Sequence, residues 1–227
     1  MTIYLYDVIV ADDWFGGVSA QSFVQALAAI TADVIHLRIN SPGGDVFAAR
    51  AIETAIRGHA AKVIAHVDGV AASAASFVML AADEVEITDG AFVMIHKAWS
   101  IAMGNADELK ETATLLDAVD ASLVRTYAKE TGQDEADIAA WMADETWFSS
   151  ADAIEKGFAD RLAGSDASAN ASAWNLAAFG NAPQAPQQRA TTPAPVAAAP
   201  THAAAAPVLP VPDLAAMKRR LDLQQRL

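Results

Sequence analysis

Two kinds of apolar segment alternate along the first 162 residues, and this alternation constrains the fold more than any other feature. Short runs rich in β-branched residues, typical of strands, lie at 3–10, 34–40, 62–67, 84–87 and 92–96. Helical spacing follows at about 20–30, 46–57 and 106–130, and a helix, a short strand and a helix are expected within 134–162. Repeated strand-then-helix units predict an α/β fold with mostly parallel strands.

Local residues set the expected ends of several elements. Ser19 is placed to cap the helix that follows it. Gly58 and Gly132 are expected to end the second helix and the long helix. The Asp68-Gly69 pair is expected to turn the chain after the third strand.

The composition changes near Ala163 and divides the chain into three predicted parts. Eight of the nine prolines fall between Pro183 and Pro212, in a stretch dominated by small and polar residues. Such a stretch buries too little apolar surface to offset chain entropy, so a flexible linker is predicted at 163–212, after a globular domain at 1–162. The final residues, 213–227, have apolar side chains at helical spacing and predict a short amphipathic helix.

The charge and the missing cysteines exclude several kinds of function. A formal net charge of −13 argues against nucleic acid as a partner, because Lys and Arg make most phosphate contacts. Without cysteine there is no disulfide framework, thiolate nucleophile or zinc-thiolate site. No run approaches the roughly 20 apolar residues that a membrane span needs. The start of the chain lacks the features of a signal peptide, and a cytoplasmic location is expected.

Two junctions between a strand and a helix carry candidate chemistry. In NSPGGD, the paired glycines Gly43 and Gly44 can direct backbone N–H groups into a cleft, although an ordinary tight turn is the simpler explanation. In DGVAASAAS, Ser73 is flanked by small residues that allow another backbone to approach, and helix capping is the alternative. Ser76 is a competing nucleophile, one turn deeper in an apolar helix.

His96, at the end of the segment FVMIH, is the candidate base. Serine is a weak nucleophile that needs an adjacent base, and histidine is the best one near neutral pH. The other four histidines lie in no comparable motif. By itself, however, a histidine at the end of a strand is more often structural.

The order and spacing of INSPGG, GVAAS and MIH resemble the proteolytic subunit of Clp proteases. The resemblance continues through TWFSSADAIEKGFAD and covers about residues 3–162. It implies the α/β fold shared by Clp proteases and crotonases, built from repeated βαβ units. It also implies a peptide substrate that pairs by strand addition, assembly into a homo-oligomeric ring, and no requirement for a metal or cofactor.

The resemblance assigns a role to each candidate residue. Ser73 matches the nucleophile and His96 matches its base. Gly44, with Gly43, and the N–H group of Ala74 match the donors of the oxyanion hole.

The third member of the triad is where the sequence departs from the family pattern. Glu145 stands where the family usually has aspartate, and Asp144 lies beside it. Either carboxylate can accept a hydrogen bond from Nδ1 of the histidine and hold its tautomer. Glu145 is favoured because of its place before the WFSSA motif.

Further departures resemble the Clp-related head maturation (prohead) proteases of tailed phages. The chain starts almost at the first core strand, the connection at residues 97–105 is short, and an Ala/Pro-rich tail follows the domain. The resemblance implies cleavage of scaffold or capsid protein, in the host cytoplasm or the assembling procapsid. The alternatives are a subunit of an ATP-dependent Clp protease with an unfoldase partner, a crotonase-like acyl-CoA enzyme, and a non-catalytic capsid assembly protein.

Overall fold

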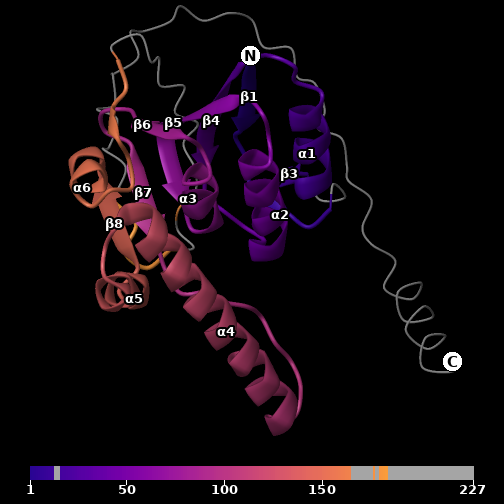
Figure 1. The fold of residues 1–227 in the computed structure, drawn as a ribbon. Coiled ribbons are helices and arrows are strands. Elements are labelled where there is room, and N and C mark those ends of the chain that lie inside the picture. The colour runs from indigo at the N-terminus through magenta and orange to yellow at the C-terminus, as the bar shows by residue number, and fades with distance from the viewer. Residues whose placement is uncertain (13–15, 165–175, 177–178, 184–227) are drawn as a thin grey trace, which may run out of the picture. The chain divides into compact units, whose positions relative to one another are not determined.

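A mostly parallel sheet of seven strands forms the centre of the computed structural model (Figure 1). The structure describes residues 1–12, 16–164, 176 and 179–183. Five strands lie parallel in the order β1 (Thr2–Leu5), β4 (Val34–Ser41), β5 (Lys62–Ala72), β6 (Glu84–Ile87) and β9 (Arg161–Leu162). The predicted α/β fold with mostly parallel strands is confirmed.

The sheet branches at β5, and the branch carries its other two strands. The first part of β5 pairs with β6 through residues 64–67, and its last residues, 70–72, pair in parallel with β7 (Phe92–Ile95). Strand β8 (Thr146–Ser149) pairs with β7 in the antiparallel direction. The ends of β5 and β7 therefore meet the start of β8 at one place.

Helices cover the apolar side of the sheet and close the domain. Their bounds in the described chain are α1 (Ala20–Ala28), α2 (Val46–Arg57), α3 (Ala74–Met79), α4 (Ala106–Thr131), α5 (Glu135–Ala143) and α6 (Ser150–Glu155). Ser19 caps α1 by accepting the N–H of Ser22 at 3.1 Å, and Gly132, with a φ of 73°, ends α4. Both caps are as predicted.

The third predicted strand does not end at the Asp68-Gly69 pair, because β5 continues through both residues. The buried carboxylate of Asp68 accepts hydrogen bonds from Arg38 and Tyr6, which offset part of the penalty for burying a charge inside a sheet. A Cβ on Gly69 would lie 2.9 Å from Oδ1 of Asn40, so a side chain here would force its neighbour Asn40 to shift, and the glycine is explained by this neighbour and not by a turn. The predicted turn is therefore wrong.

The first predicted strand, at residues 3–10, is divided in the structure. Its beginning forms β1, whereas β2 (Ile9–Val10) belongs to a separate two-stranded parallel sheet with β3 (Val18–Ser19). The N–H of Ile9 donates to the carbonyl of Gly43 at 2.8 Å. The end of this segment thus supports the glycine turn and does not extend the central sheet.

Only the C-terminal half of α4 packs on the core. Leu123 and Tyr127 are buried, whereas Leu109 and Leu115 are exposed. The N-terminal half extends beyond the sheet (Figure 1). In the described part of the chain, neither α4 nor any other helix is long and apolar enough to cross a membrane.

Little of the predicted C-terminal region is described. Within the predicted linker the structure describes residues 163–164, 176 and 179–183. The predicted amphipathic helix at 213–227 lies outside the described residues, and the domain boundaries remain predictions.

Candidate active site

Ser73 occupies the junction between β5 and α3. Its N–H donates to the carbonyl of Met94 on β7 at 2.9 Å, so the sheet anchors the junction. Its backbone has a φ of 52° and a ψ of −124°, a conformation that residues other than glycine rarely adopt. Such strained backbone persists only where the surroundings fix it, and it is concentrated at functional sites.

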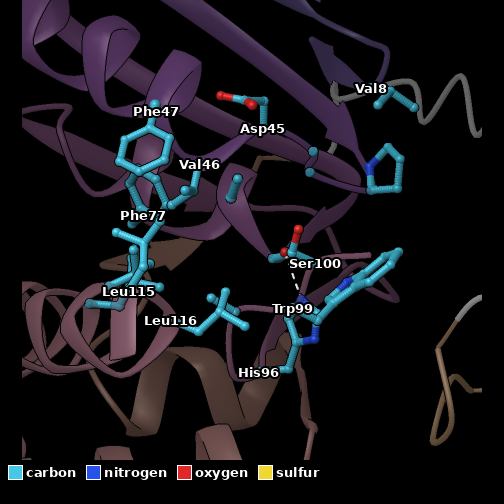
Figure 2. A pocket seen from close by; sticks show the side chains of 18 of the residues that line it. Val8, Asp45, Val46, Phe47, Phe77, His96, Trp99, Ser100, Leu115 and Leu116 are labelled. Atoms are coloured by element: carbon cyan, nitrogen blue, oxygen red, sulfur yellow. Dashed lines mark hydrogen bonds between the residues drawn. The ribbon is translucent and has the colours of Figure 1, made fainter. Parts of the chain in front are cut away.

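His96 follows β7 and meets Ser73 across the pairing of β5 with β7. Its Nε2 lies 2.7 Å from Oγ of Ser73. Figure 2 draws this hydrogen bond as the dashed line that leaves the ring of His96. With the proton on Nδ1, Nε2 accepts the serine hydroxyl, as a general base must. Burial lowers the pKa of His96, and the charges of Glu145 and Asp120 oppose this shift in part. The imidazole is therefore neutral, and able to take a proton, at neutral pH.

The pairing of β7 with β8 places Glu145 beside His96. Ile95 is opposite Thr146 in the antiparallel pair, so the residues one step beyond them, His96 and Glu145, are neighbours. Asp144 is exposed at the end of α5, one residue further from the pair. Of the two carboxylates proposed from the sequence, the structure brings Glu145 to the imidazole.

Both carboxylate oxygens of Glu145 accept hydrogen bonds. Oε1 accepts from Nε1 of Trp147 at 3.2 Å and from the N–H of Asn181 at 2.6 Å, and Oε2 accepts from the N–H of Gly180 at 3.0 Å. In the described chain, no hydrogen bond joins Glu145 to His96. Burial raises the pKa of Glu145, but the backbone donors, the indole and the imidazole together lower it below its ordinary value. Glu145 is therefore an anion at neutral pH.

The glycine turn lies directly against the nucleophile. A Cβ on Gly43, whose φ is 89°, would lie 2.7 Å from the nitrogen of Ala74 and 2.8 Å from Cβ of Ser73. The N–H of Gly43 donates to Oγ of Ser41 at 3.1 Å. Within the described residues the N–H groups of Gly44 and Ala74 donate no hydrogen bond, so both are available to an oxyanion.

A largely apolar cleft of about 500 Å³ opens beside Ser73 and His96 (Figure 2). Phe47, Phe77 and Leu116 are among its walls. An apolar wall next to a nucleophile suits an apolar side chain of a bound peptide. The described residues contain no cluster of His, Asp and Glu side chains that could hold a metal ion.

Two neighbours of His96 were not predicted from the sequence. Asp120 on α4 raises the pKa of His96 by its charge, and its Oδ1 accepts the N–H of Ala98 at 2.7 Å. The feature of the sequence that could have identified Asp120 is a carboxylate within the apolar face of a long helix. The ring of Phe179 packs edge-on against the imidazole, with centroids 5.6 Å apart. The feature of the sequence that could have identified Phe179 is an aromatic residue close to the Ala/Pro-rich stretch.

A comparison with known protein families agrees with this geometry. The family model described as Clp protease matches residues 8–166. The chain belongs to the Clp protease family. Members of the family are serine-type peptidases, which are hydrolases, so the resemblance inferred from the sequence motifs is confirmed at the level of the family.

Curated relatives within the Clp family share about three residues in ten with the chain. The ATP-dependent Clp protease proteolytic subunit 2 of Treponema denticola is 32% identical over 131 residues, or 57% of this chain and 66% of the relative. The subunit 2 of Mycolicibacterium paratuberculosis is 28% identical over 155 residues, covering 67% and 77%. That of Pseudomonas aeruginosa is 29% identical over 139 residues, covering 60% and 69%. Parts of these relatives, up to about a third, are therefore unmatched.

Ser76, the competing nucleophile, has a different place in this Clp-type site. Its side chain is buried, and its Oγ donates to the carbonyl of Ser73 at 2.6 Å. The hydroxyl of Tyr127 lies 2.7 Å from the same Oγ and donates to it. Ser76 thus stabilises the strained turn at Ser73 and is closed to substrate.

Proposed function

We propose that this Clp family member is a serine endopeptidase that cleaves scaffold or capsid protein during phage head maturation. The observation that carries the peptidase activity is the 2.7 Å contact between Oγ of Ser73 and Nε2 of His96. The short connection at residues 97–105 and the Ala/Pro-rich region after residue 163 support the phage role. The enzyme acts in the host cytoplasm or within the assembling procapsid.

The substrate binds as an extended strand beside the glycine turn. Backbone pairing next to Gly43 and Gly44 holds the peptide, as in other cases of strand addition. An apolar side chain of the substrate enters the cleft formed by Phe47, Phe77 and Leu116. Neither a metal nor a cofactor takes part, and the subunits assemble into a homo-oligomeric ring.

The reaction is acyl transfer to water. Ser73 attacks the peptide carbonyl while its proton passes to Nε2 of His96, and the N–H groups of Gly44 and Ala74 stabilise the oxyanion. His96 then gives the proton to the leaving amine, which frees the C-terminal product and leaves an acyl-enzyme. Water, activated by the same imidazole, hydrolyses the acyl-enzyme. The anion of Glu145 stabilises the imidazolium that forms in each step.

Co-expression with candidate capsid and scaffold proteins tests this function. The wild type and Ser73→Ala are compared by intact mass over time. We expect cleavage by the wild type, at sites that the masses identify, and none by Ser73→Ala. Equal cleavage by both would exclude Ser73 as the nucleophile. An acyl-CoA enzyme or a non-catalytic assembly protein would leave the substrates uncut in both samples.

A second candidate is the proteolytic subunit of an ATP-dependent Clp protease, the description that the curated relatives carry. Such a subunit receives its substrates from an ATP-driven unfoldase. Co-purification with an unfoldase, together with degradation of a folded protein only in the presence of ATP, would favour this candidate. Cleavage of scaffold or capsid protein without ATP would favour the first.

A further inference from the structure

Residues 179–181, called the strap below, follow the peptidase domain and contact the catalytic residues directly. Phe179 lines the same cleft as Ser73 and His96. The main chain of the strap donates two hydrogen bonds to Glu145, and the side chain of Asn181 donates a third, at 2.7 Å, to the carbonyl of Asp144. These contacts connect a segment outside the sheet to the carboxylate and to the base.

The strap competes with His96 for the carboxylate of Glu145. A triad carboxylate must accept the Nδ1–H of the imidazole to hold its tautomer and to stabilise its cation. The shortest bond of Glu145 comes from the N–H of Asn181, at 2.6 Å, and the strap and Trp147 together provide all three of its donors. Within the described residues His96 has its bond to Ser73 and none at Nδ1.

Phe179 reinforces this arrangement from the side of the cleft. Its ring meets the imidazole at an interplanar angle of 87° and meets the indole of Trp147 at 75°, with centroids 5.6 and 5.7 Å apart. The aromatic ring fixes the strap between the base and a donor to Glu145. It also takes up part of the cleft in which an apolar substrate side chain would lie.

We propose that the strap is an autoinhibitory latch, which holds Glu145 away from Nδ1 of His96 until substrate displaces it. A peptide whose apolar side chain enters the cleft competes with Phe179 and loosens the strap. The carboxylate then loses its backbone donors and turns to the imidazole. The latch rests on the proposed peptidase function, and its site of action is Glu145.

Proline at position 181 tests the latch in the full-length chain, because it removes the N–H that donates to Glu145. Ala182→Pro is the matched control, since it places proline one residue beyond the strap. We expect Asn181→Pro to react about 5- to 150-fold faster with a fluorophosphonate at Ser73, the usual range for coupled sites, and Ala182→Pro to react like the wild type. Unchanged or slower labelling of Asn181→Pro would overturn the latch.

The double variant Asn181→Pro/Glu145→Gln separates the latch from simple obstruction of the cleft. Since the latch acts through Glu145, Asn181→Pro should give no acceleration in the Glu145→Gln background. An equal acceleration in both backgrounds would show that the strap only blocks access and would contradict the proposal.

An NMR titration provides a readout that does not depend on catalysis. In Asn181→Pro the carboxylate is free to bind Nδ1–H, so the pKa of His96 should rise relative to wild type and to Ala182→Pro. His96→Gln assigns the resonance. An unchanged or lower pKa excludes the latch whatever the labelling shows. A raised pKa with no labelling of Ser73 in any variant would retain the latch geometry and reject the peptidase function.

Discussion

Ser73 and Glu145 are the two non-glycine residues of the described chain with a positive φ, at 52° and 49°. Each closes a turn at the site, one between β5 and α3 and the other between α5 and β8. Backbone of this kind costs about 1–3 kcal/mol per residue and needs surroundings that fix it. The bonds from the N–H of Ser73 to Met94 and from the side chain of Asn181 to the carbonyl of Asp144 are part of those surroundings.

Alanine at position 43 should destabilise the fold and abolish cleavage. Its Cβ would lie 2.5 Å from the carbonyl oxygen of Ala72, in addition to the strain of a φ of 89°. The strain contributes about 1–2 kcal/mol and the overlap about 1–3 kcal/mol, so urea unfolding should show a loss of about 2–5 kcal/mol. Gly90→Ala is the control, since Gly90 has a φ of 81° and open space around it. Equal losses for the two variants would contradict the close approach.

The acidic limb of the pH–rate profile should lie below pH 6.5, the ordinary pKa of histidine. Catalysis needs neutral His96, and burial lowers its pKa, so kcat/KM should fall only as the pH drops through that lowered value. The unfolded chain binds the proton more readily, so His96 also reduces the stability of the fold as the pH falls below 6.5. Asp120→Asn removes a charge that raises this pKa, and should move the limb to still lower pH. A limb above pH 6.5 in the wild type would exclude His96 as the titrating base.

At the scale of elements, the contact between α3 and α4 stabilises the turn that carries Ser73. Tyr127 is buried on α4, and its hydroxyl reaches Ser76 on α3, whose own Oγ donates to the carbonyl of Ser73. The capping box of Asn105 and Glu108 fixes the start of α4, and Gly132 fixes its end. The long helix is thus defined locally and then used to position a turn far from its own caps.

The sequence predicts elements well where local chemistry decides them. Ser19 and Gly132 end their helices as expected because caps satisfy backbone groups within a few residues. The Asp68-Gly69 pair misleads, because its partners Arg38 and Asn40 come from another strand. Pairing between strands is decided by the whole sheet, and a dipeptide typical of turns carries no information about it.

The same limit applies to the candidate site. The motifs around Ser73 and His96 predict two neighbours that the structure brings within 2.7 Å. The choice between Glu145 and Asp144 depends on the register of β7 with β8, which spacing alone leaves open. Composition places Phe179 in a linker. An Ala/Pro-rich stretch shows only that a segment lacks a core of its own, and it gives no information about contacts with other parts of the chain.

At the scale of the molecule, exposed apolar side chains are concentrated in the connection that leads into α4. Trp99, Ile101 and Met103 are 67%, 85% and 94% exposed. Apolar side chains gathered on a surface mark contact sites between proteins, and Clp family members are oligomeric. We therefore expect this surface to be buried between subunits.

Lysine at positions 101 and 103 should weaken assembly. Charges placed in an apolar interface cannot be solvated there, so the double variant Ile101→Lys/Met103→Lys should raise the dissociation constant about tenfold or more, measured by sedimentation velocity. Leu162→Lys is the control, at an exposed leucine on β9. If the double variant assembles like the wild type, another surface must join the subunits.

The branch at β5 also determines when the enzyme can first act. Ser73, His96 and Glu145 follow or precede three different strands, and they meet only after β7 has paired with both β5 and β8. In a chain that is still being translated, Ser73 therefore lacks the complete set of catalytic partners until β8 has left the ribosome. At ordinary rates of synthesis this is some seconds after β5.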